Sequence, residues 1–415
     1  MKNVILSLSL IAILYGCSQT SSTSKVAASQ SPVESFDKFF QSVVDTVRQQ
    51  FVPDRRVNIF DVKIKYADDK VTLKGVTTLA EAKTELLNRM QEFLNRILTA
   101  NKNIVDSISL LPEQSLGDET FGVVTLSVAS MRTSGEYSAE MATQALLGTP
   151  VKILQSGSWL RVQTPDGYIS YTYAGNIKRM NKQQFNEWIS SPKIIFTENY
   201  GFAYTAPNSS DAVSDMVAGN MLKLEDETEQ YYKVSYPDGR IAYVDKKQSK
   251  KSDEWISSIN LTGDNIADYG KRFMGVPYLW GGTSSKALDC SGFAKTVYFM
   301  HGVILQRDAS QQCYTGQPID LSDDFKNLKT GDLLFFGSKA QNGRKERIGH
   351  VAIYIGNKQF IHEATQVKIN SLDPSAANYD RYNTNRLVRA SRIIGNIDTK
   401  GITTVESNEF YQKQQ

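Results

Sequence analysis

The sequence predicts an α+β protein made of several small domains, and three observations support this prediction. The chain has 415 residues, enough for two to four domains of ~100–200 residues each. Residues 159–171 align with residues 231–243, which indicates an internal repeat. After this repeat, Cys290 and all three histidines of the chain lie in one stretch that mixes helical and strand spacing. The repeat and this stretch therefore belong to different domains.

The composition excludes several classes of protein. Hydrophobic residues make up 40% and charged residues 22% of the chain, which excludes a mostly disordered, collagen-like or coiled-coil molecule. The 47 basic and 44 acidic residues give a net charge of +3, so no overall basic field favours nucleic acid as a partner. Three cysteines are too few for a disulfide scaffold.

The N-terminal segment is typical of a leader followed by a tether. Lys2 precedes an apolar run over residues 4–15, which is shorter than the ~20 residues of a membrane-spanning helix and fits a signal peptide. The run ends at Gly16 and Cys17, a pattern that resembles the bacterial lipobox. We expect residues 1–17 to be a lipoprotein signal with a lipid on Cys17; an ordinary secretory signal is the alternative. Residues 18–33 are rich in Ser, Thr, Ala and Gln, which predicts a flexible tether.

Residues 34–112 predict a small α+β module. Apolar residues recur at helical spacing over 36–47 and again over 82–98. Between these helices, residues 62–66 and 71–75 alternate apolar and polar side chains, which predicts a hairpin, and a last strand follows at 104–111. This order resembles the BON-type module of bacterial envelopes. The segment contains no catalytic constellation, so we expect a packing or surface-interaction role.

Residues 121–180 and 194–248 predict two small β-barrels. Each contains short strands separated by Gly and Pro turns, and the Pro-Asp-Gly turn at 165–167 recurs at 237–239. Both copies resemble bacterial Src-homology-3-like (SH3-like) domains, which often accompany cell-wall enzymes.

The two copies differ at positions that bear on function. Tyr168 of the first copy corresponds to Arg240 of the second. Glu140 falls on Ala212, although Asp211 is adjacent. We therefore expect the two barrels to do different jobs.

Residues 255–396 carry the residues for nucleophilic catalysis. Cys290 lies between a Gly-Gly-Thr loop and a helical pattern over 293–300, so it begins a helix, where backbone N–H groups and the helix dipole favour a thiolate. His350 and His362 lie on two alternating strands joined by a turn at 356–358, which makes them near cross-strand neighbours. This arrangement predicts a nucleophile, a base and a residue that orients the base.

Other roles of these residues are weighed against catalysis. Zinc binding is the alternative role for Cys290 and the two histidines. The separation of Cys290 from the histidines is not that of a compact zinc site and no fourth ligand is evident, so we expect no metal. Cys313 and His301 are expected to be structural. A disulfide between Cys290 and Cys313 would block the nucleophile and is not expected. Residues 397–415 are expected to form a frayed tail.

Four ordered motifs make a family resemblance specific. They are YLWGG (278–282), DCSGF (289–293), GDLLFF (331–336) and GHVAIY (349–354), followed by His362; the segment RDASQQ (307–312) is similar to another family segment that lines the cleft. They resemble the NlpC family of papain-like cell-wall cysteine peptidases. The resemblance implies a papain-like cysteine peptidase domain over 255–396, preceded by the two SH3-like barrels and the N-terminal α+β module. A subgroup with this architecture cuts the bond between γ-D-glutamate and the diamino acid of peptidoglycan stem peptides.

The resemblance also implies substrate-binding residues. In the subgroup, an acidic residue and a tyrosine of the first barrel recognise the free amine of N-terminal L-alanine; Glu140 and Tyr168 match best, and Tyr171 is the alternative tyrosine. Arg307 would pair with the free α-carboxylate of γ-linked glutamate. The remaining cleft residues implied by the motifs are Tyr278, which would help to stabilise the oxyanion, Asp289 and Ser291, which would bind substrate backbone, and Trp280 and Asp308.

These expectations combine into one functional hypothesis. The protein is expected to be a monomeric, lipid-anchored, periplasm-facing hydrolase of the bacterial envelope that cuts L-Ala-γ-D-Glu-diamino acid peptides without a cofactor. Cys290 attacks, His350 transfers protons and His362 orients His350. The rival functions are a non-catalytic wall-binding scaffold, an acyltransferase on the same fold, and an endopeptidase that acts on intact peptidoglycan.

Overall fold

The computed structural model describes residues 32–67, 70–97, 103–341 and 343–414. The predicted signal peptide with Cys17, and residues 18–31 of the predicted tether, lie outside the described residues. None of the helices in the described ranges is long and apolar enough to cross a membrane.

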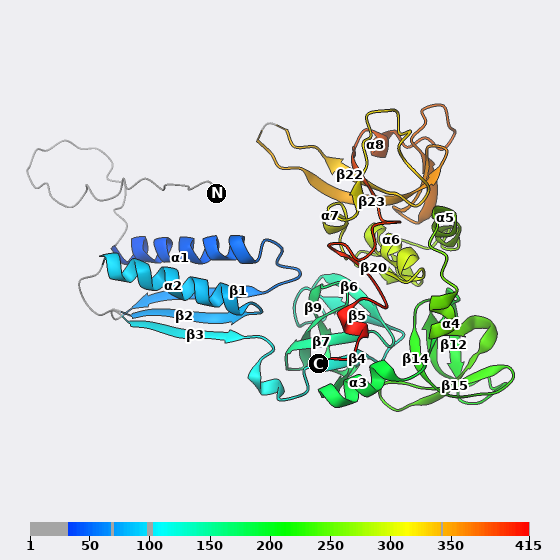
Figure 1. Cartoon of the computed structure of the whole chain (residues 1–415), viewed down its shortest axis with the longest axis horizontal. Helices are drawn as coiled ribbons and strands as arrows, with labels where there is room; N and C mark the ends of the chain where they lie inside the picture. The colour runs from blue at the N-terminus through cyan, green and yellow to red at the C-terminus, as the bar shows by residue number, and fades with distance from the viewer. Residues whose placement is uncertain (1–31, 68–69, 98–102, 342, 415) are drawn as a thin grey trace, which may run out of the picture.

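The N-terminal module packs two helices on one face of a three-stranded sheet (Figure 1). Its elements are α1 (Pro32–Phe51), β1 (Phe60–Ala67), β2 (Lys70–Thr77), α2 (Ala80–Ile97) and β3 (Asn103–Leu110). β2 pairs with β1 in antiparallel and with β3 in parallel orientation. Apolar side chains at helical spacing, such as Val44 and Leu86, meet Val71 and Leu73 in the core. The predicted order of helix, hairpin, helix and strand is confirmed, while the hairpin turn at 68–69 lies outside the described residues.

Two seven-stranded sheets follow, and they have the same strand order. The first barrel consists of β4 (Phe121–Val124), β5 (Val128–Arg132), β6 (Met141–Leu146), β7 (Pro150–Gln155), β8 (Trp159–Gln163), β9 (Ile169–Tyr173) and β10 (Ile177–Met180). The second barrel consists of β11 (Lys193–Phe196), β12 (Tyr200–Tyr204), β13 (Ala212–Val217), β14 (Met221–Glu227), β15 (Tyr231–Ser235), β16 (Ile241–Asp245) and β17 (Ser249–Lys251).

The strand order is β10-β4-β7-β8-β9-β5-β6 in the first barrel and β17-β11-β14-β15-β16-β12-β13 in the second. Each strand of the second barrel is thus the counterpart, seven strands later, of the strand at the same place in the first. The internal repeat predicted from the sequence is therefore confirmed in the strand topology.

A helix that the sequence analysis did not anticipate links the barrels. α3 (Lys182–Ser190) starts at Asn181, whose side chain accepts the N–H of Gln184 in a capping box. Its Phe185 and Trp188 are buried against the first barrel. The linker is thus a packed extension of that barrel.

The C-terminal domain is built on a six-stranded antiparallel sheet. Its strands are β21 (Gln317–Pro318), β22 (Leu333–Ser338), β23 (Arg347–Gly356), β24 (Gln359–Glu363), β25 (Val367–Ser371) and β26 (Leu387–Arg392), in the order β21-β26-β22-β23-β24-β25. Its helices are α4 (Ser252–Ser257), α5 (Gly263–Lys271), α6 (Cys290–Phe299), α7 (Ala309–Gln312) and α8 (Arg381–Thr384). Phe293 and Val297 of α6 share a core with Val351 and Ile353 of β23, which fixes the start of α6 beside that strand.

Short strands complete this domain, and one of them corrects the prediction of a frayed tail. They are β18 (Thr283–Ser284), β19 (Ala287–Leu288), β20 (Val303–Leu305) and β27 (Ile402–Thr404). β27 pairs with β20, and Phe410 is buried. The side-chain amide of Asn408 donates to the Pro165 carbonyl of the first barrel at 2.9 Å. Side chains of the segment pack on two domains: Ile402 belongs to the core of the peptidase domain, and Lys152 of the first barrel lies over the Phe410 ring. Figure 1 shows the segment, in red, running from the peptidase domain to the first barrel.

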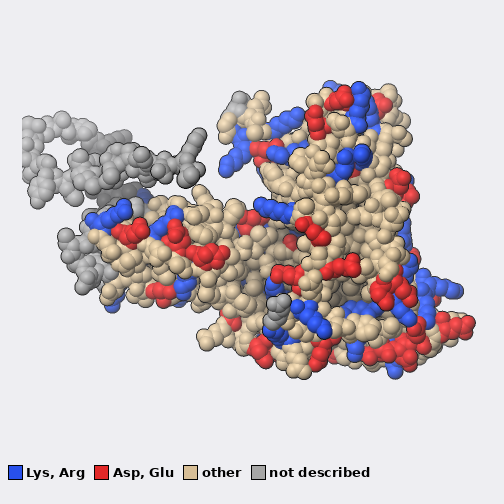
Figure 2. Space-filling view, in the orientation of Figure 1, with Lys and Arg blue, Asp and Glu red and all other residues tan. Residues whose placement is uncertain are grey.

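The charged side chains form no field of one sign on the face shown in Figure 2, where Lys and Arg mix with Asp and Glu. This distribution agrees with the small net charge of +3. Recognition at this face therefore depends on local groups.

Candidate active site

Cys290 is the first residue of α6, and the preceding residue caps the helix. The Asp289 carboxylate accepts the N–H of Gly292 at 2.7 Å and that of Gly281 at 3.0 Å. A Cβ on Gly292 would lie 1.9 Å from the carbonyl oxygen of Gly282, so only glycine lets the helix start this close to the preceding loop. These contacts fix the cysteine at the helix start, as the sequence predicts.

The buried side chain of Arg307 binds the Asp289 carboxylate that caps α6. Its guanidinium donates to both Asp289 oxygens, at 2.5 and 3.1 Å, to Ser291 Oγ at 2.9 Å and to Thr143 Oγ1 of the first barrel at 2.9 Å. The residue is 1% exposed. These contacts hold Arg307, Asp289 and Ser291 together and leave the guanidinium buried. Arg307 therefore positions the start of α6.

A chain of hydrogen bonds links the two histidines to an asparagine. Nδ2 of Asn370 lies 3.0 Å from the carbonyl oxygen of Asn378, which can only accept, and this contact fixes the orientation of the amide. Oδ1 of Asn370 therefore accepts from Nε2 of His362 at 2.9 Å. In neutral His362, Nδ1 is then an acceptor, and it lies 2.8 Å from Nε2 of His350. His350 thus carries its hydrogen on Nε2, and its Nδ1 is free to act as a base.

The contact between the histidines was expected, but Asn370 was missed. It lies on β25, the strand beside that of His362, opposite Phe360. The only signal in the sequence was a polar residue on a strand next to the histidine hairpin, and the motifs do not include it.

The electrostatics of the nucleophile differ from the prediction. Burial and the adjacent Asp289 carboxylate raise the pKa of the Cys290 thiol to about 12, although the backbone N–H groups of Val351 and Ser291 oppose this shift. The N–H groups at the helix start favour the thiolate, as expected, but burial outweighs them and leaves the pKa of the thiol raised. Burial, and then the neighbouring His362, lower the pKa of His350 to about 3. The cysteine and its potential base are both neutral at neutral pH.

The thiol faces a cavity of about 350 Å³ to which three parts of the chain contribute. The N-terminal module contributes Arg56, and the first barrel contributes Thr133, Glu140, Ala142 and Tyr168. The C-terminal domain contributes Tyr278, Trp280, Gly281, Asp289, Cys290, Ser291, Arg307, Asp308, Ala309, Ser310, Ile348 and Gly349. All the predicted substrate-binding residues line this one cavity.

The first barrel forms one wall of the cavity through a direct side-chain contact. Trp280 Nε1 donates to Glu140 Oε1 at 2.7 Å. Gly281 has a φ of +80°, and a Cβ there would lie 2.6 Å from the Met141 carbonyl oxygen, so glycine permits the close approach of loop and barrel. The Glu140 side chain remains exposed despite this contact, so its carboxylate is accessible from the cavity.

The structure distinguishes between the candidate tyrosines. Tyr168 lines the cavity, whereas Tyr171 is not among its lining residues and instead lies under the guanidinium of Arg161. In the second barrel, Arg240 donates to the Thr125 carbonyl of the first barrel at 2.8 Å. The position equivalent to Tyr168 therefore serves contact between the barrels and not the cavity.

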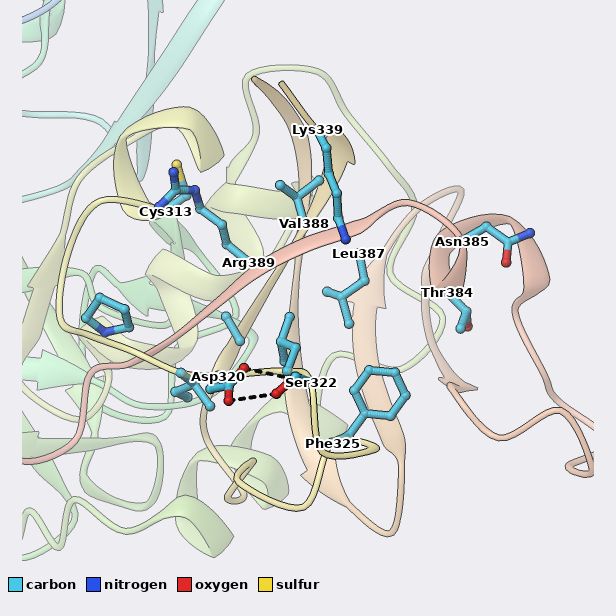
Figure 3. A pocket seen from close by; sticks show the side chains of 14 residues that line it. Cys313, Asp320, Ser322, Phe325, Lys339, Thr384, Asn385, Leu387, Val388 and Arg389 are labelled. Carbon is cyan, nitrogen blue, oxygen red and sulfur yellow. Dashed lines mark hydrogen bonds between the residues drawn. The ribbon is translucent and has the colours of Figure 1, made fainter. Parts of the chain in front are cut away.

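The remaining cysteine and histidine lie apart from this cavity. Cys313 lines a different cavity of about 580 Å³, together with Phe325, Lys339 and Arg389 (Figure 3). Cys290 and Cys313 are both free and buried. Nδ1 of His301, in the turn after α6, lies 2.9 Å from the carbonyl oxygen of Val297 in the last turn of that helix. Among the described residues, no group of three or more His, Cys, Asp and Glu side chains is arranged to hold a metal ion.

Comparison with known proteins agrees with this site. The sequence profile of the NlpC/P60 family matches residues 275–392, and that of the bacterial dipeptidyl-peptidase SH3 domain matches residues 131–172. A relative from Bacillus cereus, named γ-D-glutamyl-L-lysine dipeptidyl-peptidase, is 30% identical over 230 residues, which cover 54% of this chain and 67% of the relative. Dipeptidyl-peptidase 6 of Lysinibacillus sphaericus is 27% identical over 263 residues, 60% of this chain and 91% of that protein.

A solved structure supports the fold. The crystal structure of an NlpC/P60 family protein from Bacillus cereus matches with a TM-score of 0.55 and 24% identity, over 66% of this chain and 99% of that one. The chain belongs to the NlpC/P60 family. It is therefore a cysteine peptidase with a papain-like domain and an SH3-like domain, as the sequence predicts.

Proposed function

We propose that this peptidase hydrolyses the γ-D-glutamyl–diamino acid bond of peptidoglycan stem peptides whose N-terminal L-alanine carries a free amine. The observation that carries the proposal is the cavity that joins Cys290 to Glu140, an exposed carboxylate on the first barrel. The names of the relatives support the choice of bond, because the Bacillus cereus relative is named for γ-D-glutamyl-L-lysine.

The chemistry follows from the hydrogen positions in the site. The Cys290 thiol transfers its proton to Nδ1 of His350 as sulfur attacks the γ-glutamyl carbonyl. The imidazolium then donates this proton to the departing amine of the diamino acid, which leaves an acyl-enzyme. Water loses a proton to the same nitrogen as it attacks the thioester, and sulfur takes the proton back when the acid departs. His362 and Asn370 keep the accepting nitrogen of His350 directed away from them throughout.

Tyr278 is the proposed side-chain donor to the oxyanion. Burial raises the pKa of its hydroxyl, and the nearby Cys290 and Asp289 raise it further. The group therefore stays protonated and can donate to an oxygen that becomes negative during attack.

Glu140 is the proposed partner of the substrate ammonium. A trimmed peptide presents a charged amine, whereas an uncut stem carries an acyl group on that nitrogen and has no charge there. A charge-assisted hydrogen bond at an exposed carboxylate is worth about 1–2 kcal/mol. This corresponds to a ~5- to 30-fold change in kcat/KM.

The experiment compares L-Ala-γ-D-Glu-diamino acid with its N-acetylated form. Wild-type enzyme is expected to prefer the free amine, and Glu140→Gln is expected to lose most of that preference. Asp211→Asn, beside the corresponding position of the second barrel, is the matched control and is expected to keep it. Equal hydrolysis of both peptides by wild type, or a preference for intact peptidoglycan, would contradict the proposal.

We also propose the cellular setting that the leader predicts. A lipid on Cys17 would hold the enzyme at a membrane of the bacterial envelope, facing the periplasm, where it would act as a monomer on released peptides. The proposal includes no metal or cofactor.

A further inference from the structure

The N-terminal module reaches the catalytic cavity through the segment between α1 and β1. The Arg56 carbonyl accepts the N–H of Ile169 of the first barrel at 2.7 Å. The Val57 carbonyl accepts from the Gln163 amide at 3.1 Å. On the other side, Asp54 accepts from Gln311 of α7 at 2.8 Å. The segment is thus fixed between the first barrel and the peptidase domain.

The guanidinium of Arg56 forms part of the cavity wall. Its Nε and Nη2 donate to the two oxygens of Asp54, each at 2.8 Å. Its Nη1 donates to Asp308 Oδ2 and to Ser310 Oγ, both at 2.8 Å. The side chain is 34% exposed. Four contacts hold the charge in place while one side remains open to the cavity.

The ion pair between Arg56 and Asp308 changes the charge of the cavity that a substrate enters. Three carboxylates line the cavity, those of Glu140, Asp289 and Asp308. Asp289 is paired with Arg307, and Asp308 is paired with Arg56. Glu140 makes no ion pair with any residue that the structure describes. Among the described residues, Glu140 is therefore the one carboxylate of the cavity wall that has no cationic partner.

We propose that Arg56 is a specificity-determining residue of the peptidase site, contributed by the N-terminal module. By pairing with Asp308, it leaves Glu140 as the single acceptor for the substrate ammonium. With Asp308 unpaired as well, two carboxylates of the cavity could accept the ammonium, and the substrate would no longer be held by Glu140 alone. This inference rests on the proposed function, because it assumes a substrate with a free amine.

The test is a double-mutant cycle on the free-amine peptide. In the wild-type background, Glu140→Gln is expected to lower kcat/KM by ~5- to 30-fold. In an Arg56→Gln background, the released Asp308 carboxylate can also accept the ammonium, so Glu140→Gln is expected to cost at most ~3-fold. When Asp308→Asn is added to Arg56→Gln, with and without Glu140→Gln, the cost of Glu140→Gln is expected to return to its wild-type value. An equal cost of Glu140→Gln in both backgrounds would overturn the inference.

A matched control and a second comparison keep the test decisive. Arg55→Gln removes the neighbouring arginine, which is more exposed and pairs with Asp61, and the cost of Glu140→Gln is expected to stay unchanged in that background. If Arg56→Gln does not fold, as judged by thermal melting, single variants in the wild-type background decide. Glu140→Gln must then cost more than Asp308→Asn, and equal costs would overturn the inference.

The failure of this inference is distinguishable from that of the proposed function. Absence of any preference for the free amine in wild-type enzyme contradicts the proposed function. A clear preference in wild type, combined with an unchanged cycle, contradicts the role of Arg56 alone.

Discussion

Replacing Asn370 tests whether a residue outside the cavity sets the protonation pattern of the catalytic base. Asn370→Leu keeps a side chain of similar size but removes both the acceptor for His362 and the donor to the Asn378 carbonyl. His362 is 0% exposed, so water cannot replace the lost acceptor. The imidazole is then free to place its hydrogen on Nδ1, and His350 must carry its own hydrogen on the nitrogen needed as a base.

The magnitude follows from the lost hydrogen bond. Leaving a buried N–H without an acceptor costs about 1–3 kcal/mol, which corresponds to a ~5- to 150-fold lower kcat if the transition state bears the whole cost. KM is expected to change little, because Asn370 does not line the cavity. Steady-state hydrolysis of the free-amine peptide measures both constants.

Asn370→Asp gives a second, independent readout. A carboxylate still accepts from His362, but its charge stabilises an imidazolium and raises the pKa of the histidine pair. Activity is therefore expected to be lost at a higher pH than in wild type as the pH falls. Asn378→Ala is the control, since it keeps the backbone carbonyl that orients Asn370. An unchanged kcat in Asn370→Leu with an unchanged acid limb in Asn370→Asp would refute the proposed proton arrangement.

Three further predictions concern other parts of the chain. Arg307→Met is expected to destabilise the fold by about 3–5 kcal/mol, because it leaves Asp289 buried without its cation; a raised KM with an unchanged melting temperature would instead support a contact with the substrate carboxylate. Burial raises the pKa of Glu363 to about 7, so the stability that its protonated form contributes is lost as the pH rises from about 4.5 through 7. Glu363→Gln is therefore expected to raise stability by about 3 kcal/mol at pH 8 and by less than about 1 kcal/mol at pH 5, and equal melting shifts at both pH values would argue against this assignment. Cys17→Ala is expected to move the protein from membranes to the soluble envelope fraction, and variant protein that still sediments with membranes after a salt wash would place the anchor elsewhere.

Local patterns carried most of the information that was available before the structure. The alternation around His350 and His362 predicts a hairpin, and in the hairpin Nε2 of His350 lies 2.8 Å from Nδ1 of His362. The start of α6 at Cys290 follows from helical spacing after a Gly-rich loop. The barrel repeat is visible because equivalent strands keep equivalent apolar positions.

Features that depend on packing between distant segments were not predictable in the same way. Arg56 and Asp308 are far apart in the chain, and their ion pair exists because the N-terminal module docks at the cavity. Arg307 is a charged residue in a cleft motif, so a substrate contact was the natural interpretation; its burial against Asp289 and Thr143 depends on the first barrel. The C-terminal segment is mostly polar in sequence, and its contacts, such as that between Phe410 and Lys152 of the first barrel, depend on neighbouring domains.

The central claim is that the Cys290 thiol, with His350 as its base, cuts the γ-D-glutamyl bond. The most direct measurement is mass spectrometry of L-Ala-γ-D-Glu-diamino acid peptide after incubation with wild type, Cys290→Ala and His350→Ala, each shown by thermal melting to be folded. Wild type is expected to release L-Ala-D-Glu and the free diamino acid, and both variants are expected to release neither. Near-normal product formation by folded Cys290→Ala would contradict the account.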